Sequence, residues 1–355
     1  MNKVLISIII PCYNNGTLLF KMIDCILRQT YIDWELIVVD DGSTDSTQDI
    51  VRKYTEKDER IKMLIREREP KGAPTCRNIG IKNSNGKYFV IFDADDLISD
   101  TCLEKRVAFM EANPDIDYAS FPAKMWYANS LIVPQYKDWG KTWGVSNDCV
   151  DLLTLFLKGD YPFTVWTNIY KKKSIKNILW DEKLKVYMDF DFIILGIINE
   201  LKHKFSGLNE IDYFYRIYNN ADNICSSFVS EEKNTSTIYL IDKTLDLIKK
   251  TKNFNKYKQD FLYFILIHYG RLLSEVDNSN INNSNIDNYL NICFTYYSKF
   301  TIKQFQILRF IMLKIKNRIM RQKVIHIIFF IWFEHNRYFN IIKINIQSKL
   351  YHNNK

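Results

Sequence analysis

The stretch Lys87–Asp96 reads KYFVIFDADD and joins a strand pattern to three carboxylates. After Lys87, its first residues are apolar and β-prone, which is typical of a strand buried in a sheet. Three carboxylates within four residues repel one another, so a cation normally has to compensate them. Carboxylate oxygens suit Mg²⁺ or Mn²⁺, and these ions favour phosphate oxygens as further ligands. A solvated acidic turn is the alternative reading of this tetrad taken alone.

Two similar strand patterns come earlier in the chain, at Val4–Ile10 and Glu35–Val39. A helical pattern, Leu18–Leu27, lies between them, and we expect Pro11 to end the first strand because it has no N–H for a central ladder. Strand, helix and strand in this order predict a doubly wound α/β sheet. Such sheets bind ligands at the carboxyl ends of their strands.

Unusual side chains follow three of these strands. The ring of Tyr13 suits stacking on a nucleobase, and the carboxylate of Asp41 suits an imide N–H. The tetrad Asp93–Asp96 suits ribose hydroxyls and a metal-bridged diphosphate. Neither a Gly-x-Gly-x-x-Gly motif nor a Walker lysine is present, which argues against a dinucleotide fold or a P-loop.

Four motifs resemble those of family 2 glycosyltransferases of the GT-A fold. They are Ile10–Asn14 (IPCYN), Val38–Asp45 (VVDDGSTD), Gly72–Gly80 (GAPTCRNIG) and Phe92–Asp96 (FDADD), and the looser resemblance extends to residue 220. It implies a doubly wound mixed sheet flanked by helices, and transfer of a sugar from a nucleoside diphosphate with Mn²⁺ or Mg²⁺ as the cofactor.

The same resemblance implies a role for each residue of the nucleotide site. By this resemblance, Pro11 shapes the wall of the site, and Tyr13 and Asp41 contact the base. Arg77 would hold the base or the diphosphate. Asp93 would contact the ribose, and Asp95 would hold the metal. Asp96 also follows the family pattern and is a weaker candidate for a sugar contact. A UDP-sugar is the expected donor, and a dTDP-sugar remains open because both bases carry an imide N–H.

An inverting transferase also needs a carboxylate that deprotonates the acceptor hydroxyl. The family commonly places it in a Glu-Asp pair that opens a helix, and the matching residue here is Asp189. Met188 replaces the usual acidic neighbour. Asp191 is the competing candidate, and the third possibility is that both carboxylates only favour the helix dipole.

Phe163–Tyr170 resembles the strand that lines the sugar site of the family. Trp166 could stack on a sugar face and Asn168 could bond sugar hydroxyls, although a strand tryptophan is more often a core residue. Arg216 is a weaker candidate near the diphosphate. The Gln-x-x-Arg-Trp pattern of processive members is absent, which favours single additions.

The chain divides into three expected regions: a catalytic domain at 1–225, with nucleotide and acceptor halves at 1–100 and 101–225, a helical linker at 226–300, and a basic tail at 301–355. The tail holds eleven lysines and arginines and one acidic residue, Glu334. An apolar stripe that begins at Leu308 predicts an interfacial helix on an anionic membrane. The alternative is a helix packed on the catalytic domain, and no motif supports nucleic-acid binding.

Seven scattered cysteines and the lack of a signal-peptide pattern predict a cytoplasmic protein, held peripherally on the inner face of the membrane. The expected acceptor is a glycan or a lipid-linked glycan of a bacterial surface polysaccharide or glycolipid. A non-catalytic scaffold that binds nucleotide sugars is the alternative, mainly because of Met188. A sugar nucleotidyltransferase normally needs a glycine-rich basic loop, which is not found here.

Overall fold

The computed structural model describes residues 5–127, 142–144, 151–217 and 230–275, with isolated positions between 287 and 306. The chain forms two compact units, one of Met1–Ser227 with Tyr239–Leu262 and the other of Phe228–Ile238 with Tyr263–Lys355. Every candidate site residue lies in the first unit. The apolar stripe of the basic tail lies outside the described residues, so the predicted membrane helix remains a prediction.

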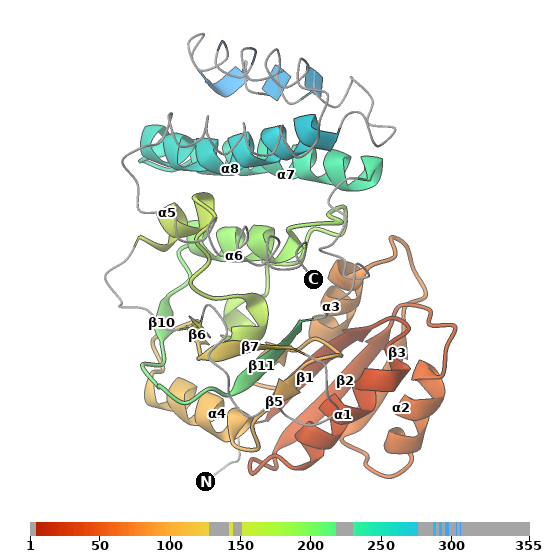
Figure 1. Cartoon of the computed structure of the whole chain (residues 1–355). Coiled ribbons are helices and arrows are strands. Elements are labelled where there is room, and N and C mark those ends of the chain that lie inside the picture. The colour runs from red at the N-terminus through yellow and green to blue at the C-terminus, as the bar shows by residue number, and fades with distance from the viewer. Residues whose placement is uncertain are drawn as a thin grey trace, which may run out of the picture. The chain divides into compact units, whose positions relative to one another are not determined.

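A seven-stranded mixed sheet forms the centre of the first unit, as expected for this fold class (Figure 1). Its strands, in spatial order, are β10 (His203–Phe205), β6 (Tyr118–Ser120), β9 (Asn168–Lys171), β4 (Tyr88–Ile91), β1 (Ile6–Cys12), β2 (Trp34–Asp40) and β3 (Ile61–Ile65). Strands β4, β1, β2 and β3 are parallel, whereas β9 is antiparallel to β4 and to β6. The carboxyl ends of β1, β2 and β4 therefore meet at one edge, where the strand order reverses.

Pro11 lies inside β1, so the expectation that it ends this strand is wrong. Its register partner is Val39 of β2, whereas the pairing with β4 stops at Ile9. The amide of Asp41 donates to the carbonyl oxygen of Cys12, so the backbone polar groups of Cys12 face β2. The missing N–H of Pro11 therefore faces the side on which the paired register with β4 has already ended.

Helices cover the parallel strands. The described helices are α1 (Gly16–Leu27), α2 (Thr47–Thr55), α3 (Ala73–Asn83), α4 (Cys102–Ala112), α5 (Leu152–Leu157), α6 (Met188–Ile198), α7 (Glu231–Lys249) and α8 (Phe254–Glu275). Helices α1 and α2 pack side by side (Figure 1), and right-handed crossovers place α3 on the opposite face of the sheet. Gly80 lets α3 approach the sheet, because a Cβ there would lie 2.3 Å from Cγ2 of Ile9.

A second, four-stranded sheet lies beside the tetrad. It has the order β5 (Leu97–Ile98), β11 (Tyr213–Ile217), β7 (Ala123–Tyr127) and β8 (Thr142–Trp143). Strand β5 directly follows Asp96, so the tetrad links the two sheets. Phe92 packs against Tyr213 of β11 with their ring centroids 5.2 Å apart.

Two long helices, α7 and α8, each contribute residues to both units. The proposed boundaries of the three regions stay a prediction. Within the described residues, no helix has both the length and the apolar character needed to cross a membrane.

Candidate active site

Asp40 and Asp41 are adjacent, yet their side chains have different tasks. Asp40 Oδ2 accepts hydrogen bonds from the amides of Gly42 (3.1 Å) and Ser43 (3.0 Å) and from Gln48 Nε2 (2.8 Å). Gly42 has a φ of 83°, in the left-handed region that favours glycine, so Asp40 and Gly42 together form the turn after β2. Asp40 therefore holds the loop, and Asp41 is the carboxylate available for a ligand.

A cation that the sequence motifs do not include accompanies Asp41. Arg66 forms a buried ion pair with Asp41 Oδ1, and the amide of Gly72 lies 3.3 Å from the same oxygen. These contacts, and that of Cys76 Sγ at 3.6 Å, are all made with Oδ1 of Asp41. Arg66 directly follows β3, so its place at the carboxyl end of a parallel strand is the signal that could have identified it.

Tyr13 lies where a base-stacking residue is expected. Its side chain is 44% exposed, and the ammonium of Lys71 lies 3.4 Å from the ring centroid. Pro11, half-buried inside β1, precedes Tyr13 by two residues. The structure thus brings Pro11, Tyr13 and Asp41 to one edge of the sheet, as the sequence predicts, while their contact with a base stays a prediction.

Arg77 connects the two halves of the site. Its Nη1 donates to Asp189 and its Nη2 donates to Asp93 Oδ1 at 3.2 Å. The arginine is almost fully buried, whereas the side chains of Asp93 and Asp189 are 28% and 35% exposed. Within the described residues, the buried Nε of Arg77 has no hydrogen-bond partner. One guanidinium thus brings together a carboxylate that follows β4 and a carboxylate at the start of α6.

The carboxylates of the tetrad differ in their surroundings. Burial raises the pKa of Asp93 to about 6, with Arg77 opposing the shift and Asp189 and Asp95 adding to it. Burial also raises the pKa of Asp96, with the charges of its two neighbours contributing. Asp93 therefore holds its negative charge less firmly than an exposed aspartate does.

Asp96 ties the tetrad to the second sheet. Its oxygens accept hydrogen bonds from the hydroxyl of Tyr213 and from the amide of Arg216, both at 2.6 Å, and it is 1% exposed. Arg216, which the resemblance puts near the diphosphate, also donates from Nε to the carbonyl oxygen of Asp95. These contacts give Asp96 and Arg216 a structural task, and the burial of Asp96 does not favour the predicted sugar contact.

Asp189 lies in the first turn of α6, and the preceding Tyr187 has a φ of 56°. The indole N–H of Trp180 lies 3.5 Å from Asp189 Oδ1, and the Trp180 ring stacks on Phe192 with centroids 3.5 Å apart. Asp191 points elsewhere, because its Oδ2 accepts from Lys243 at 2.8 Å. Of the two candidates for the base, the structure brings only Asp189 to the tetrad.

A short segment before α6 supports this arrangement, and the sequence motifs do not reveal it. Asn78, next to Arg77, bonds both the amide and the carbonyl of Trp180 at 3.0 Å. Glu182 accepts from Asn78 at 2.8 Å and from both Nη atoms of Arg68 at 2.6 Å. The side chain of Asn78 therefore anchors the Trp180–Glu182 segment.

Trp166 and Asn168 are both buried, which does not favour their predicted contact with a sugar. Trp166 lies in a 3₁₀ turn, Val165–Thr167, because β9 begins only at Asn168. Its ring stacks on Tyr213 and on Tyr215, with centroids 4.8 Å and 5.1 Å apart. The side chain of Asn168 is bonded to Ser120, Thr167 and Tyr170.

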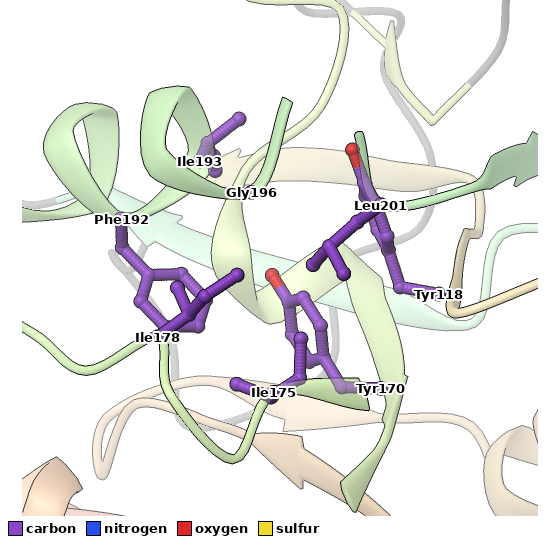
Figure 2. Close-up of a pocket in the computed structure, with 8 residues that line it drawn as sticks. All are labelled: Tyr118, Tyr170, Ile175, Ile178, Phe192, Ile193, Gly196 and Leu201. Atoms are coloured by element: carbon purple, nitrogen blue, oxygen red, sulfur yellow. The ribbon is translucent and has the colours of Figure 1, made fainter. Parts of the chain in front are cut away.

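A small apolar hollow lies beneath α6. Figure 2 shows its lining, which consists of Tyr118, Tyr170, Ile175, Ile178, Phe192, Ile193, Gly196 and Leu201. No charged side chain lines it, so it is a packing defect under the helix that carries Asp189.

The residues at the strand ends fit one kind of metal site. Within the described part of the chain, no group of three or more His, Cys, Asp or Glu side chains is arranged to hold a metal ion. Magnesium, however, is commonly held by one or two carboxylates together with substrate phosphates. Asp93 and Asp95 are hard oxygen donors at the carboxyl end of β4, which suits a metal that arrives with a diphosphate.

Known proteins with similar sequences share this region of the chain. Residues 7–143 match the family described as glycosyl transferase family 2. An uncharacterized glycosyltransferase of Haemophilus influenzae is 33% identical over 217 residues, which cover 61% of this chain and 81% of that relative. The glycosyltransferase GlyA of Streptococcus pneumoniae is 30% identical over 222 residues, which cover 60% of this chain and 30% of GlyA.

A solved structure has the same fold. S. aureus TarS 1–349, in complex with UDP-GlcNAc, superposes with a TM-score of 0.59 at 20% identity, over 82% of this chain and 80% of that one. The sheet and the carboxylates at its strand ends define a glycosyltransferase of the GT-A fold. The chain belongs to glycosyl transferase family 2, and it spans less than a third of GlyA.

Proposed function

We propose that the chain transfers a sugar, with inversion, from a UDP-sugar to a hydroxyl of a glycan or lipid-linked glycan, and that the reaction depends on Mn²⁺ or Mg²⁺. The observation that carries the proposal is the Arg77 bridge. Its two Nη atoms hold Asp189 and Asp93 beside each other, so a base and a nucleotide-binding carboxylate face one reaction space. An inverting transfer requires this proximity.

The surroundings of Asp41 favour uracil or thymine over guanine as the donor base. Oδ2 of Asp41 can accept one imide N–H, while the guanidinium of Arg66 on Oδ1 offers donors to an adjacent base carbonyl. Guanine would present two adjacent N–H donors to the carboxylate, and Oδ1 is already engaged. The UDP-sugar bound to TarS agrees with this preference.

Each residue of the site has a proposed task. Tyr13 stacks on the base, Asp93 binds the ribose, and Asp95, with Asp93 beside it, would hold the metal ion. When bound there, the ion would supply positive charge for the leaving diphosphate. Arg77 orients Asp189, and Asp189 takes the proton from the acceptor hydroxyl as its oxygen attacks the anomeric carbon. Met188 does not weaken this assignment, since Asp189 keeps its contact with Arg77.

We also propose that the protein works at the inner face of the membrane, because its expected acceptors are made there and its tail is rich in cations. The acidic and polar residues of the site fit this chemistry better than the scaffold alternative, which would not need a base beside Asp93.

Asp189→Asn tests the proposal. It should abolish sugar transfer and slow UDP release from UDP-sugars by about 100-fold or more, because the amide cannot accept the proton. The affinity for UDP, measured by calorimetry with Mn²⁺, should change little. Asp49→Asn, which alters a surface carboxylate that is 72% exposed, is the control and should behave like the wild type. Unchanged turnover in Asp189→Asn, or a parallel collapse of UDP affinity, would refute the assignment.

A further inference from the structure

Lys243 of helix α7 ties the start of α6 to that helix. Its Nζ donates to Asp191 Oδ2 at 2.8 Å and to Asp181 Oδ2 at 2.7 Å. The hydroxyl of Tyr239, also in α7, donates to the same oxygen of Asp181 at 2.8 Å. These residues form what we call the Lys243 cluster: Asp181, Asp191, Tyr239 and Lys243.

Both carboxylates of this cluster adjoin the elements that hold Asp189. Asp191 is two residues further along the first turn of α6. Asp181 directly follows Trp180, whose indole N–H points at Asp189 from 3.5 Å. Lys243 therefore fixes two separate segments, the helix start, which carries Asp189, and the Trp180–Glu182 segment, which contacts Asp189.

The ammonium of Lys243 compensates the charge of Asp191, which is deeply buried. The Asp191 side chain is 1% exposed and that of Asp181 is 14% exposed. Oδ1 of Asp191 has no hydrogen-bond partner within the described residues. A buried carboxylate without a cation is costly, so the loss of the ammonium should make the first turn of α6 shift toward water.

We propose that Lys243 is a positioning residue for catalysis: through Asp191 and Asp181 it holds the start of α6 and Trp180 in the places that aim Asp189 at the reaction space. This inference rests on the proposed function of Asp189 as the base. It assigns a catalytic consequence to α7, a helix that lies beyond the residues 7–143 matched by the family.

Lys243→Met tests the proposal in the full-length chain, and Lys256→Met is its matched control. Lys256 also joins one of the long helices to the catalytic region, by an ion pair with Asp151 at the start of α5, far from Asp189 in the sequence. UDP release from UDP-GlcNAc, UDP-glucose and UDP-galactose with Mn²⁺ gives kcat and KM. UDP affinity comes from calorimetry, and amide hydrogen exchange reports on residues 187–193.

Lys243→Met should lower kcat about 10- to 100-fold, since a small misplacement of a catalytic group has effects of this size. UDP affinity should stay within about twofold of the wild type, and exchange at 187–193 should become faster. Lys243→Arg should recover most of the turnover, because it keeps a cation in place. Lys256→Met should leave turnover, UDP affinity and this exchange unchanged.

If Lys243→Met does not fold, the double variant Lys243→Met/Asp191→Asn carries the same test without an unpaired buried carboxylate. Unchanged exchange at 187–193 together with a normal kcat would overturn the inference, as would a parallel loss of UDP affinity and turnover. If the wild type releases no UDP, or Asp189→Asn releases it equally fast, the proposed function fails instead. The exchange data then still decide whether Lys243 holds the start of α6.

Discussion

Arg77→Met removes the cation that bridges Asp93 and Asp189, and both stability and turnover should fall. Removing one partner of a buried ion pair typically costs 3–5 kcal/mol. Here the two carboxylates are 28% and 35% exposed, so water can compensate part of the loss. We therefore expect the free energy of unfolding to decrease by about 2–3 kcal/mol, which corresponds to a melting temperature about 4–6 °C lower for a unit of this size.

Arg77→Lys is the discriminating variant. An ammonium keeps the charge but cannot present two nitrogens in the fixed fork that reaches both carboxylates. The free energy of unfolding of Arg77→Lys should therefore fall by about half as much as that of Arg77→Met. Its turnover should still be at least about 10-fold slower than that of the wild type.

Thermal unfolding and UDP release with Mn²⁺ measure the two effects. Arg52→Met, on the exposed face of α2, is the control and should change stability by less than about 0.5 kcal/mol. A melting temperature of Arg77→Met equal to that of the wild type would show that the bridge is not a stabilising contact. Full activity in Arg77→Lys would show that the fork does not orient Asp189.

Three further predictions concern other sites. Burial lowers the pKa of His203 to about 3, so only the unfolded chain takes up this proton as the pH falls below about 6.5, and the fold loses stability. The free energy of unfolding, measured with urea, should decrease by about 2 kcal/mol from pH 7 to pH 5, and this decrease should be missing in His203→Gln. Gly196→Ala should raise the free energy of unfolding by about 0.5–1 kcal/mol, because a Cβ there lies 3.4 Å from Cδ1 of Leu201, and a lower melting temperature would contradict it. Asp93→Asn should raise the free energy of unfolding at pH 7 by about 1–3 kcal/mol, because the pKa of Asp93 in the fold, about 6, lies above the usual value and the fold disfavours the ionised form. The same change should abolish UDP-sugar turnover. A loss of stability would show that the attraction of Arg77 outweighs the burial.

The parallel half of the fold could be predicted from the sequence because burial leaves a local pattern. Strands β1, β2 and β4 are buried on both faces, and their continuous apolar runs mark them. The carboxyl ends of these strands then fix where Tyr13 and Asp41 lie. The prediction that Pro11 ends β1 was wrong, because the effect of a proline depends on which neighbouring strand has already ended.

The antiparallel half could not be predicted in this way, because its partners are distant in the chain. Strand β9 lies between β4 and β6, and nothing within its four residues specifies that place. Trp166 is likewise buried by tyrosines that lie 47 and 49 residues further on. Local periodicity reports whether a residue is buried, and it does not report which residue covers it.

The contacts of the site residues could not be predicted from local sequence either. The sequence predicted roles for Asp93 and Asp189 separately, and it predicted that Arg77 contacts the nucleotide. It did not predict that Arg77 bridges the two carboxylates, because the contact with Asp189 is a tertiary one that spans 112 residues. Arg66 and Trp180 belong to no motif used for the prediction. Arg66 pairs with Asp41, and Trp180 contacts Asn78 and Asp189, so only the folded chain reveals them.

The two guanidinium groups of the site have a consequence for the order in which ligands assemble. Arg66 accompanies Asp41, and Arg77 accompanies Asp93 and Asp189, so these acidic groups have counter-ions supplied by the chain itself. A bare divalent ion that approaches Asp93 meets a guanidinium already in contact with it. A diphosphate that carries such an ion brings its own negative charge and can draw the guanidinium aside as it enters. Nucleotide and metal should therefore enter together, as one complex, rather than metal first.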